Sequence, residues 1–281
     1  MKREELFLIA FPFLLSAAII FGHHRILTSQ NPQAHSRPLI PTRAVQKLKD
    51  SELTPVPQAE PFPESVAGAM HEIPTSRKQL SELLALINSQ KANTVLLRVG
   101  MTLSPNGNII LTQAAESSEE TLLRWTKKAV SDAHTAGIHT YIALMFVEEP
   151  QISNPDSFAA QLGSVIKRWS SMAQEYHVSF FDPGIILGHP SYLTVPKERL
   201  QQLVIEIERK TREAYTGRIG IGLCCKPTQI SARGYNQLLI ISKLGSPSEA
   251  MLQKARQDAL RDEIEHIYLL ELDTQRLSSI R

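Results

Sequence analysis

The amino-acid sequence predicts an α/β protein, a (β/α)8-type TIM barrel that is incomplete at its C-terminus or contains one strand that the pattern does not reveal. From residue 65 onward, apolar strand-like segments alternate with amphipathic helix-like segments, which is typical of repeated βαβ units. The stretch Tyr176–Tyr192 contains two continuous apolar runs bounded by turn residues, as expected for a strand covered by helices on both faces. Right-handed crossovers between neighbouring strands would close such a sheet into a barrel.

The predicted strands are rich in β-branched and aliphatic residues, which favour extended structure. They cover residues 65–71, 93–101, 138–147, 176–192, 218–224, 237–242 and 265–272. The sequence ends at Arg281, soon after the seventh of these segments, so an eighth strand is not accounted for. An open doubly wound sheet is the alternative. No GxGxxG or GxxxxGK loop follows an early strand, which argues against its nucleotide-binding version.

Capping residues mark where the predicted helices begin. These signals are Ser76 with Gln79, Ser117 with Glu120, Asn154 with Pro155, and the run Ser246-Pro247-Ser248-Glu249. Another helix is predicted over residues 196–214, where apolar residues recur at helical spacing. Gly137 and Gly217 follow predicted helices at the position where a left-handed residue ends a helix.

Composition excludes several classes of function. The chain has 281 residues, of which 42% are hydrophobic, and a formal net charge of +2, so it lacks the broad basic field that nucleic-acid binding uses. The cysteines, Cys224 and Cys225, are adjacent and would point to opposite faces of a strand. We therefore expect buried thiols without a disulfide. No metal or cofactor is predicted, because no CxxC or similar spacing is present.

The N-terminal region predicts export. Leu6–Gly22 is apolar and uncharged, and its length of about 25 Å as a helix is at the short end of what crosses a bilayer. We interpret residues 1–29 as a signal anchor, with a cleaved signal peptide as the alternative. Residues 30–63 are proline-rich and predict an extended linker. Residues 64–281 would then form a membrane-anchored, extracytoplasmic barrel, or a secreted one if the segment is cleaved.

Three segments of the sequence resemble a known family: KANTVLLRVGMTLSPNGN, TLLRWTKKAVSDAHTAGIHTYIALMF and FAAQLGSVIKRWSSMAQEYHVSFFDPG. They resemble the retaining (β/α)8 glycoside hydrolases of the endo-galactanase and mannanase-like branches. The resemblance implies a glutamate acid/base after strand four and a glutamate nucleophile at the end of strand seven. In IYLLELD, Glu271 stands at the nucleophile's place, but strand four carries Ile185 and Ile186 where the family has Asn-Glu.

Retaining hydrolysis needs two carboxyl groups about 5–5.5 Å apart, so a substitute for the missing acid is required. Asp182 could serve if the strand ends there and Pro183-Gly184 forms a turn. The alternative is a buried, hydrogen-bonded structural aspartate. Arg98 matches an arginine that the resembled family places near its catalytic glutamates. As a buried cation, Arg98 requires a carboxylate partner.

Other candidate sugar-binding residues follow strands three and four of the pattern. Glu148 and Glu149 could bind sugar hydroxyls, or they could belong to a solvated loop. His189 lies at the same predicted rim, and Tyr192 is the best candidate for stacking on a sugar ring. His71-Glu72 also reaches the rim, but its spacing gives no support to a metal site.

The sequence therefore predicts a membrane-anchored, glycoside-hydrolase-like barrel that binds oligo- or polysaccharide and is non-catalytic, either as a carbohydrate-binding protein or as a degenerate homologue. The alternative is an active retaining glycosidase that uses Glu271 as its nucleophile. A phosphate-handling barrel is a third class, but no phosphate-cradling loop supports it.

Overall fold

The computed structural model describes residue 48 and residues 65–115, 118–148, 152–192, 195–224, 229–242 and 247–280. The chain divides into two compact units, Met1–Arg43 and Ala44–Arg281, and all the described residues belong to the second. The predicted membrane span, residues 6–22, and most of the predicted linker lie outside the described residues. Within the described part, no helix has the length and apolar character needed to span a bilayer.

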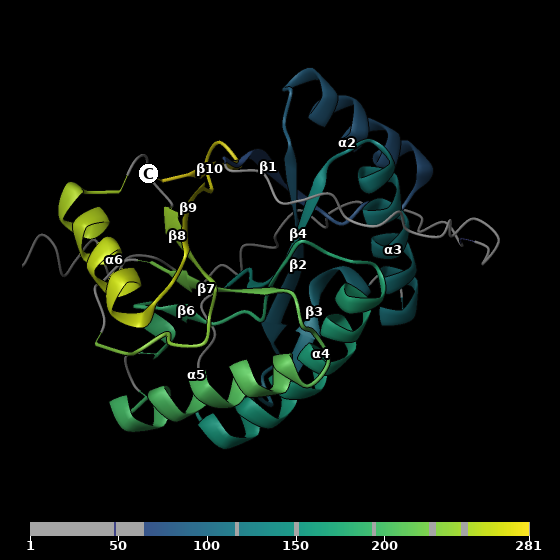
Figure 1. Cartoon of the computed structure of the whole chain (residues 1–281). Helices are drawn as coiled ribbons and strands as arrows, with labels where there is room; N and C mark the ends of the chain where they lie inside the picture. Colours follow the sequence, from purple (N-terminus) through teal and green to yellow (C-terminus); the bar gives the residue numbers. More distant parts are fainter. Residues whose placement is uncertain are drawn as a thin grey trace, which may run out of the picture. The chain divides into compact units, whose positions relative to one another are not determined.

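The described chain forms a closed barrel (Figure 1). Parallel strands follow one another around it in the order β1 (Ala67–Glu72), β2 (Thr94–Leu103), β4 (His139–Phe146), β5 (Phe180–Asp182), β7 (Arg218–Leu223), β8 (Gln237–Ser242) and β9 (His266–Glu271). The last strand, β10 (Arg276–Ser279), lies between β9 and β1 and is antiparallel to both. The prediction of a TIM-type barrel is confirmed, and it is complete in strand number.

The strand that sequence analysis missed is β10. It follows β9 after the four-residue turn 272–275, where Gln275 has a φ of 54°. Its sequence, RLSS, contains one apolar side chain, Leu277, which is buried inside the barrel. A segment with so little apolar content has no strand periodicity to detect. The pairing with β9 and β1 places it in the sheet.

The stretch 176–192 is less regular than predicted, because β5 ends at Asp182 and a second short strand, β6 (Ile186–Leu187), continues along β7. Gly184 lies between them with a φ of 92°, which favours glycine. A Cβ atom at Gly184 would also lie 2.9 Å from Met101 Cε and 3.0 Å from the Leu144 carbonyl oxygen. The Pro183-Gly184 turn interrupts the strand at the place that the sequence indicated.

Five described helices cover the outside of the strands (Figure 1). They are α2 (Arg77–Ser89), α3 (Glu119–Thr135), α4 (Pro155–Glu175), α5 (Lys197–Arg212) and α6 (Glu249–Asp262). The predicted caps Ser76 and Asn154 are confirmed. Two cap positions are corrected: Ser118 and Ser248 cap α3 and α6, while the predicted Ser117 and Ser246 lie outside the described residues. In each case the hydroxyl of the second of two nearby serines accepts a hydrogen bond from the first turn of the helix. Ser248 Oγ, for example, accepts from the Met251 amide at 3.3 Å.

The remaining elements are short. β3 (Ile109–Leu111) pairs antiparallel with β2, and 3-10 turns occupy Thr112–Ala115 and Pro190–Tyr192. Between β7 and β8 the described residues contain no helix. Asp262 instead fastens this connection by accepting hydrogen bonds from Ser231 Oγ (2.9 Å) and the Ala232 amide (2.7 Å).

Alternation along the strands creates two apolar clusters. One fills the barrel interior and includes Met70, Leu96, Phe180, Leu239 and Leu277, and the larger one lies between the barrel and its helices. Leu48, within the predicted linker, is buried in the outer cluster, and its carbonyl accepts a hydrogen bond from Arg124 Nη1 at 3.4 Å. The linker therefore contacts the barrel at this residue. The predicted boundaries at residues 29 and 63 stay predictions.

Candidate functional site

The mouth of the barrel, at the carboxyl ends of the parallel strands, is where barrel enzymes carry their active sites. Glu72 at the end of β1 lies opposite Arg98 in β2. The Arg98 guanidinium donates through Nη2 to Glu72 Oε1, and the two side chains are 27% and 48% exposed. The carboxylate partner that sequence analysis required for Arg98 is thus Glu72. Burial lowers the pKa of Arg98, but a guanidinium stays protonated at neutral pH.

The strand register places Asp182 level with this ion pair. Arg98 lies opposite Ala143 in β4, and Ala143 lies opposite Asp182 in β5. Asp182 has the same inward direction as Phe180, two residues before it. The small side chain of Ala143 separates the two polar positions in this row.

Asp182 is sealed inside the structure. It is 3% exposed, and its Oδ1 accepts a hydrogen bond from the Gly184 amide at 2.8 Å. Burial raises the pKa of Asp182 from 3.8 to about 7, although the Gly184 hydrogen bond acts in the opposite direction. The carboxyl group therefore holds the turn that separates β5 from β6. Its raised pKa is a property that general acids share.

Glu271 does not join this group. Tyr268 and Leu270 belong to the interior cluster, whereas Ile267 and Leu269 pack against the outer cluster. Alternation gives Glu271 the outward direction of Leu269, and its Oε2 accepts a hydrogen bond from Thr274 Oγ1 at 3.1 Å within the β9–β10 hairpin. Asp182 and Glu271 therefore lie on opposite faces of the barrel wall, so the structure does not bring the two predicted catalytic residues together.

Apolar side chains occupy most of the interior near the mouth. Met145, Cys224, Ile241 and Leu270 are buried there, and Ile186 is half-buried beside them. Ile186 is the residue that stands at the acid/base position of the resembled family. Apart from Asp182, the Glu72–Arg98 pair supplies the charge at this level of the described interior.

Two of the predicted sugar-binding residues are not presented to solvent. Tyr192 is 4% exposed and packs edge-on against Phe158 of α4, with ring centroids 6.4 Å apart. His189 is also buried. A side chain that stacks on a sugar needs an exposed face, so the placement of Tyr192 does not support that role. Glu148 is exposed directly after β4, and Glu149 lies outside the described residues.

Sequence analysis missed two buried polar side chains deeper in the barrel, Tyr141 and Gln237. A Cβ atom at Gly220 would lie 2.6 Å from Tyr141 Oη and 2.7 Å from Gln237 Nε2, so these groups occupy the space that a side chain on β7 would fill. Gln237 is fully buried at the start of β8. The available signal was a polar residue opening an otherwise apolar strand. Elsewhere, the described residues contain no group of three His, Cys, Asp or Glu side chains arranged to hold a metal ion.

No protein-family model matches the chain, and no curated protein matches its sequence. Solved structures do match its fold. A GH113 β-1,4-mannanase is 9% identical over 73% of this chain and 71% of its own, with a TM-score of 0.50. The cellulase Cel5C_n is 14% identical over 73% of this chain and 64% of its own, with a TM-score of 0.53. The catalytic domain of Thermobifida fusca endoglucanase Cel5A, in complex with cellotetraose, is 12% identical over 74% and 67%, with a TM-score of 0.51.

This chain has the barrel fold of glycoside hydrolases. The neighbours are (β/α)8 glycoside hydrolases of clan GH-A, which confirms the likeness of fold that the sequence phrases indicated. The chain spans less than two thirds of the cellulase's length. At these identities the likeness concerns the fold, and the chemistry has to be argued from this chain's own residues.

Proposed function

We propose that this protein is a non-catalytic, carbohydrate-binding barrel. Its ligand class is the β-1,4-linked oligosaccharide, and its ligand site is the mouth that contains Arg98 and Glu72. The fold supports this assignment, because solved neighbours include a mannanase and an endoglucanase in complex with cellotetraose. A partly exposed ion pair in a mainly apolar mouth offers donors and acceptors to sugar hydroxyls beside a surface suited to the apolar faces of sugar rings.

The observation that carries the non-catalytic assignment is the placement of the carboxylates. Among the described residues of the barrel wall, Glu72 and Asp182 are the carboxylates that face inward. Glu72 is bound by Arg98, and Asp182 is buried and accepts a hydrogen bond from the Gly184 amide. Glu271 faces outward, so among the described residues it does not pair with Asp182 in the two-carboxylate arrangement of retaining hydrolysis, and this supports the proposal.

One observation favours the alternative, an active glycosidase. The pKa of Asp182 is raised to about 7, which is the range that a general acid needs near neutral pH. In that alternative Glu271 is the nucleophile, and Glu271→Gln would abolish hydrolysis of both natural and activated glycosides.

Hydrolysis assays separate the two functions. The full chain in detergent should leave aryl β-glucosides and β-mannosides intact, and Ile186→Glu should stay inactive because Glu271 faces outward. Turnover of an aryl glycoside that is lost in Glu271→Gln would overturn the non-catalytic assignment. Contaminating activity is excluded by requiring that the turnover disappear in the variant.

Binding is tested by titration calorimetry with cello- and manno-oligosaccharides. We expect binding by the native chain and at least tenfold weaker binding by Arg98→Ala, since a mouth cation that contacts ligand contributes more than about 1.4 kcal/mol. Arg233→Ala is the matched control, because Arg233 also forms an ion pair with a glutamate, Glu263. Arg233 lies in the loop that leads into β8, and Glu263 directly follows α6. Absence of binding, or equal effects of the two variants, would contradict the assignment of the mouth.

The proposed location is the membrane surface, with residues 6–22 as an uncleaved anchor and the barrel outside the cytoplasm. The support is the apolar, uncharged run preceded by Lys2 and Arg3. Carbonate extraction should leave the native chain in the membrane fraction with its N-terminus intact. A soluble product that begins after about residue 22 would instead indicate a cleaved signal peptide and secretion.

A further inference from the structure

A small aliphatic surface borders the mouth of the barrel, where β3 pairs with the end of β2 (Figure 1). Thr102 of β2 lies opposite Ile110 of β3, and the neighbours of both residues in their strands pack against the outer apolar cluster. Alternation therefore turns Thr102 and Ile110 to the other face of the hairpin, which is the face of Arg98 in β2. Ile110 is 41% exposed there.

Val147, directly after β4, extends this surface toward Arg98. A Cβ atom at Gly100 would clash with Thr112 Oγ1 and would lie 3.1 Å from Val147 Cγ1. Gly100 lies between Arg98 and Thr102 on the same face of β2, so the two side chains cover bare backbone at this point. Val147 is 42% exposed. We refer to Ile110 and Val147 as the aliphatic shelf.

The hairpin that carries Ile110 is fixed by hydrogen bonds. Within its turn, the Gly107 amide donates to the Ser104 carbonyl at 2.8 Å. From α4, Gln161 Oε1 accepts from the Ile109 amide at 2.8 Å, and Gln161 Nε2 donates to the Gly107 carbonyl at 3.3 Å. A surface that is already held in place loses little conformational entropy when a ligand packs on it.

The size and chemistry of the shelf suit a small ligand better than a protein. Ile110 and Val147 each expose less than half of their surface, whereas a stable protein interface buries about 800 Å² on each partner. Small-molecule sites combine apolar surface with a few polar groups that fix orientation. The hydroxyls of Thr102 and Thr112 are such groups, and both residues are half-buried beside the shelf. A pyranose ring, with an apolar C–H face bordered by hydroxyls, has the complementary pattern.

We propose that the aliphatic shelf is a second sugar subsite, on which one ring of the oligosaccharide packs its C–H face while another ring contacts Arg98. The inference rests on the proposed sugar-binding function of the mouth and adds a requirement for ligand length. Thr102, opposite Ile110, lies four residues beyond Arg98 in β2, which is about 13 Å along a strand. A ligand therefore has to be longer than a disaccharide to contact both places.

Titration calorimetry of the full chain tests this requirement with cello- and manno-oligosaccharides, from the disaccharide to the hexasaccharide. Affinity should rise with length in the native chain. Ile110→Asn and Val147→Thr should each weaken hexasaccharide binding about fivefold, which corresponds to about 1 kcal/mol, and leave disaccharide binding unchanged. Val147→Thr nearly preserves the shape of the side chain, so it keeps the test valid if Ile110→Asn alters the circular dichroism spectrum. Equal losses at every length would overturn the arrangement of two subsites.

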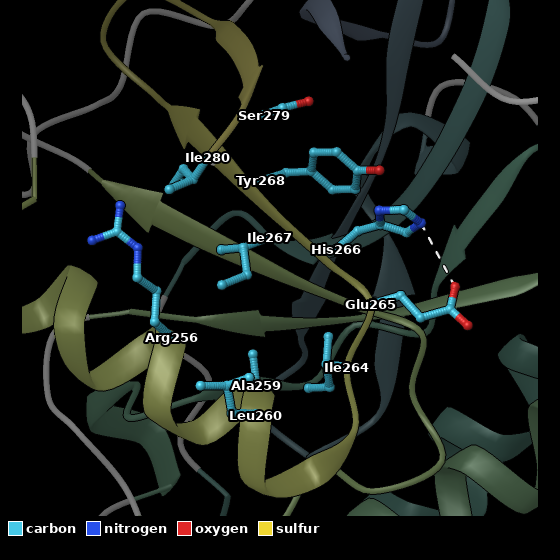
Figure 2. A pocket seen from close by; sticks show the side chains of 10 residues that line it. All are labelled: Arg256, Ala259, Leu260, Ile264, Glu265, His266, Ile267, Tyr268, Ser279 and Ile280. Carbon is cyan, nitrogen blue, oxygen red and sulfur yellow. Dashed lines mark ion pairs between the residues drawn. The ribbon is translucent and has the colours of Figure 1, made fainter. Parts of the chain in front are cut away.

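Leu260→Asn is the matched control for removing an exposed aliphatic side chain. Leu260 is 82% exposed on α6, and it lines a cavity of about 380 Å³ between α6 and β9 (Figure 2). This variant should bind the hexasaccharide like the native chain, because the cavity is not lined by shelf residues. Equal weakening by Leu260→Asn and Ile110→Asn would overturn the assignment of the subsite to the shelf.

Arg98→Ala distinguishes failure of this inference from failure of the proposed function. If Arg98→Ala weakens binding and the two shelf variants bind the hexasaccharide like the native chain, the shelf is not a subsite and the mouth is still the ligand site. If the native chain binds none of the oligosaccharides, both proposals are overturned. Sedimentation of the native chain tests a second copy as the occupant: association that Ile110→Asn abolishes would assign the shelf to a dimer instead.

Discussion

From β1 to β5, a described helix lies between each pair of consecutive parallel strands of the barrel wall, namely α2, α3 and α4. From β7 to β10, the described residues contain one helix, α6, between β8 and β9. We refer to β1–α4–β5 as the first half and to β7–β10 as the second half. Both halves close the same barrel, but they cover its outer face by different means.

Individual side chains anchor the described residues of the connection between β7 and β8, which contain no helix. Arg212 of α5 donates to the Gly234 carbonyl at 3.2 Å and to Asn236 Oδ1 at 2.7 Å, and Tyr235 Oη donates to the Val204 carbonyl at 3.0 Å. Backbone polar groups that leave the helix pattern need such partners. Asp262 shows how firmly the loop is held: burial raises its pKa, but hydrogen bonds from Arg261, Ala232 and Ser231 outweigh burial and lower it overall.

The polar groups of the candidate site follow the same division. Glu72, Arg98 and Asp182 all belong to the first half and share one register row. Glu271 belongs to the second half, where the chain turns back at 272–275 and its side chain faces outward. Among the described residues, the inward-facing polar row therefore belongs to the first half.

The largest expected effect comes from removing β10. A chain that stops after Glu271 leaves both β9 and β1 without the neighbour to which they are hydrogen-bonded, and it removes the buried Leu277. The loss should exceed the net stability of a typical domain, about 5–15 kcal/mol. We expect no cooperative thermal transition by circular dichroism.

The control for this truncation is a chain that stops at Ile280 and retains the whole of β10. It should unfold at nearly the native temperature. The chain that stops after Glu271 could instead also unfold cooperatively at that temperature. In that case the first half folds stably without a closed barrel, and the two halves are more independent than the strand pairing indicates.

The next largest effect concerns Asp182 and pH. Because the folded pKa is raised to about 7, the folded state binds a proton that the unfolded state releases above about pH 4. The stabilising contribution of protonated Asp182 is therefore fully present at low pH and is lost as pH rises from about 4 to about 7. The loss is on the order of 4 kcal/mol.

Asp182→Asn tests this sign, because asparagine can still accept the hydrogen bond from the Gly184 amide but does not titrate. Urea unfolding at a series of pH values gives the difference in free energy of unfolding between the two proteins. This difference should shift in favour of the variant as pH rises from about 4 to about 7. Parallel profiles across that window would show that Asp182 is not buried as a neutral acid.

The smallest effect compares two helix caps, one in each half. Ser76→Ala removes the hydroxyl that accepts from the Gln79 amide at 3.3 Å, and Ser248→Ala removes the equivalent bond to Met251. Each loss is worth about 1 kcal/mol. Ser76→Ala should lower the global free energy of unfolding, since α2 packs within the helix-covered half.

Ser248→Ala should act locally, because α6 is the one described helix of the second half. We expect amide exchange in α6 to accelerate about fivefold, the factor that corresponds to about 1 kcal/mol, with a smaller change in global stability. Hydrogen exchange with mass-spectrometric detection distinguishes these cases. Equal global losses for both variants would indicate that the second half unfolds together with the first.

The sequence determined the elements whose signals are local. Asn154 predicted the start of α4 because its side chain accepts from the Asp156 and Ser157 amides at 3.1 and 3.0 Å, a contact between residues two and three apart. Parallel strands such as β8 were predicted at their observed bounds because burial on both faces requires a continuous apolar run. The sequence also predicted that Arg98 pairs with a carboxylate, since a half-buried cation needs one, but it did not identify Glu72 as that partner.

Tertiary structure decided which face each side chain occupies. Glu271 and Leu270 are adjacent in a strand, and a shift of one residue in register exchanges the inside of the barrel with the outside. The sequence does not contain that choice locally, because it depends on how β9 pairs with β8 and β10 when the barrel closes. For the same reason, β10 forms part of the barrel wall despite its polar sequence, because it pairs with β9 and β1. Tyr192 is likewise buried by a tertiary contact, with Phe158 of α4, a helix thirty-odd residues away in the chain.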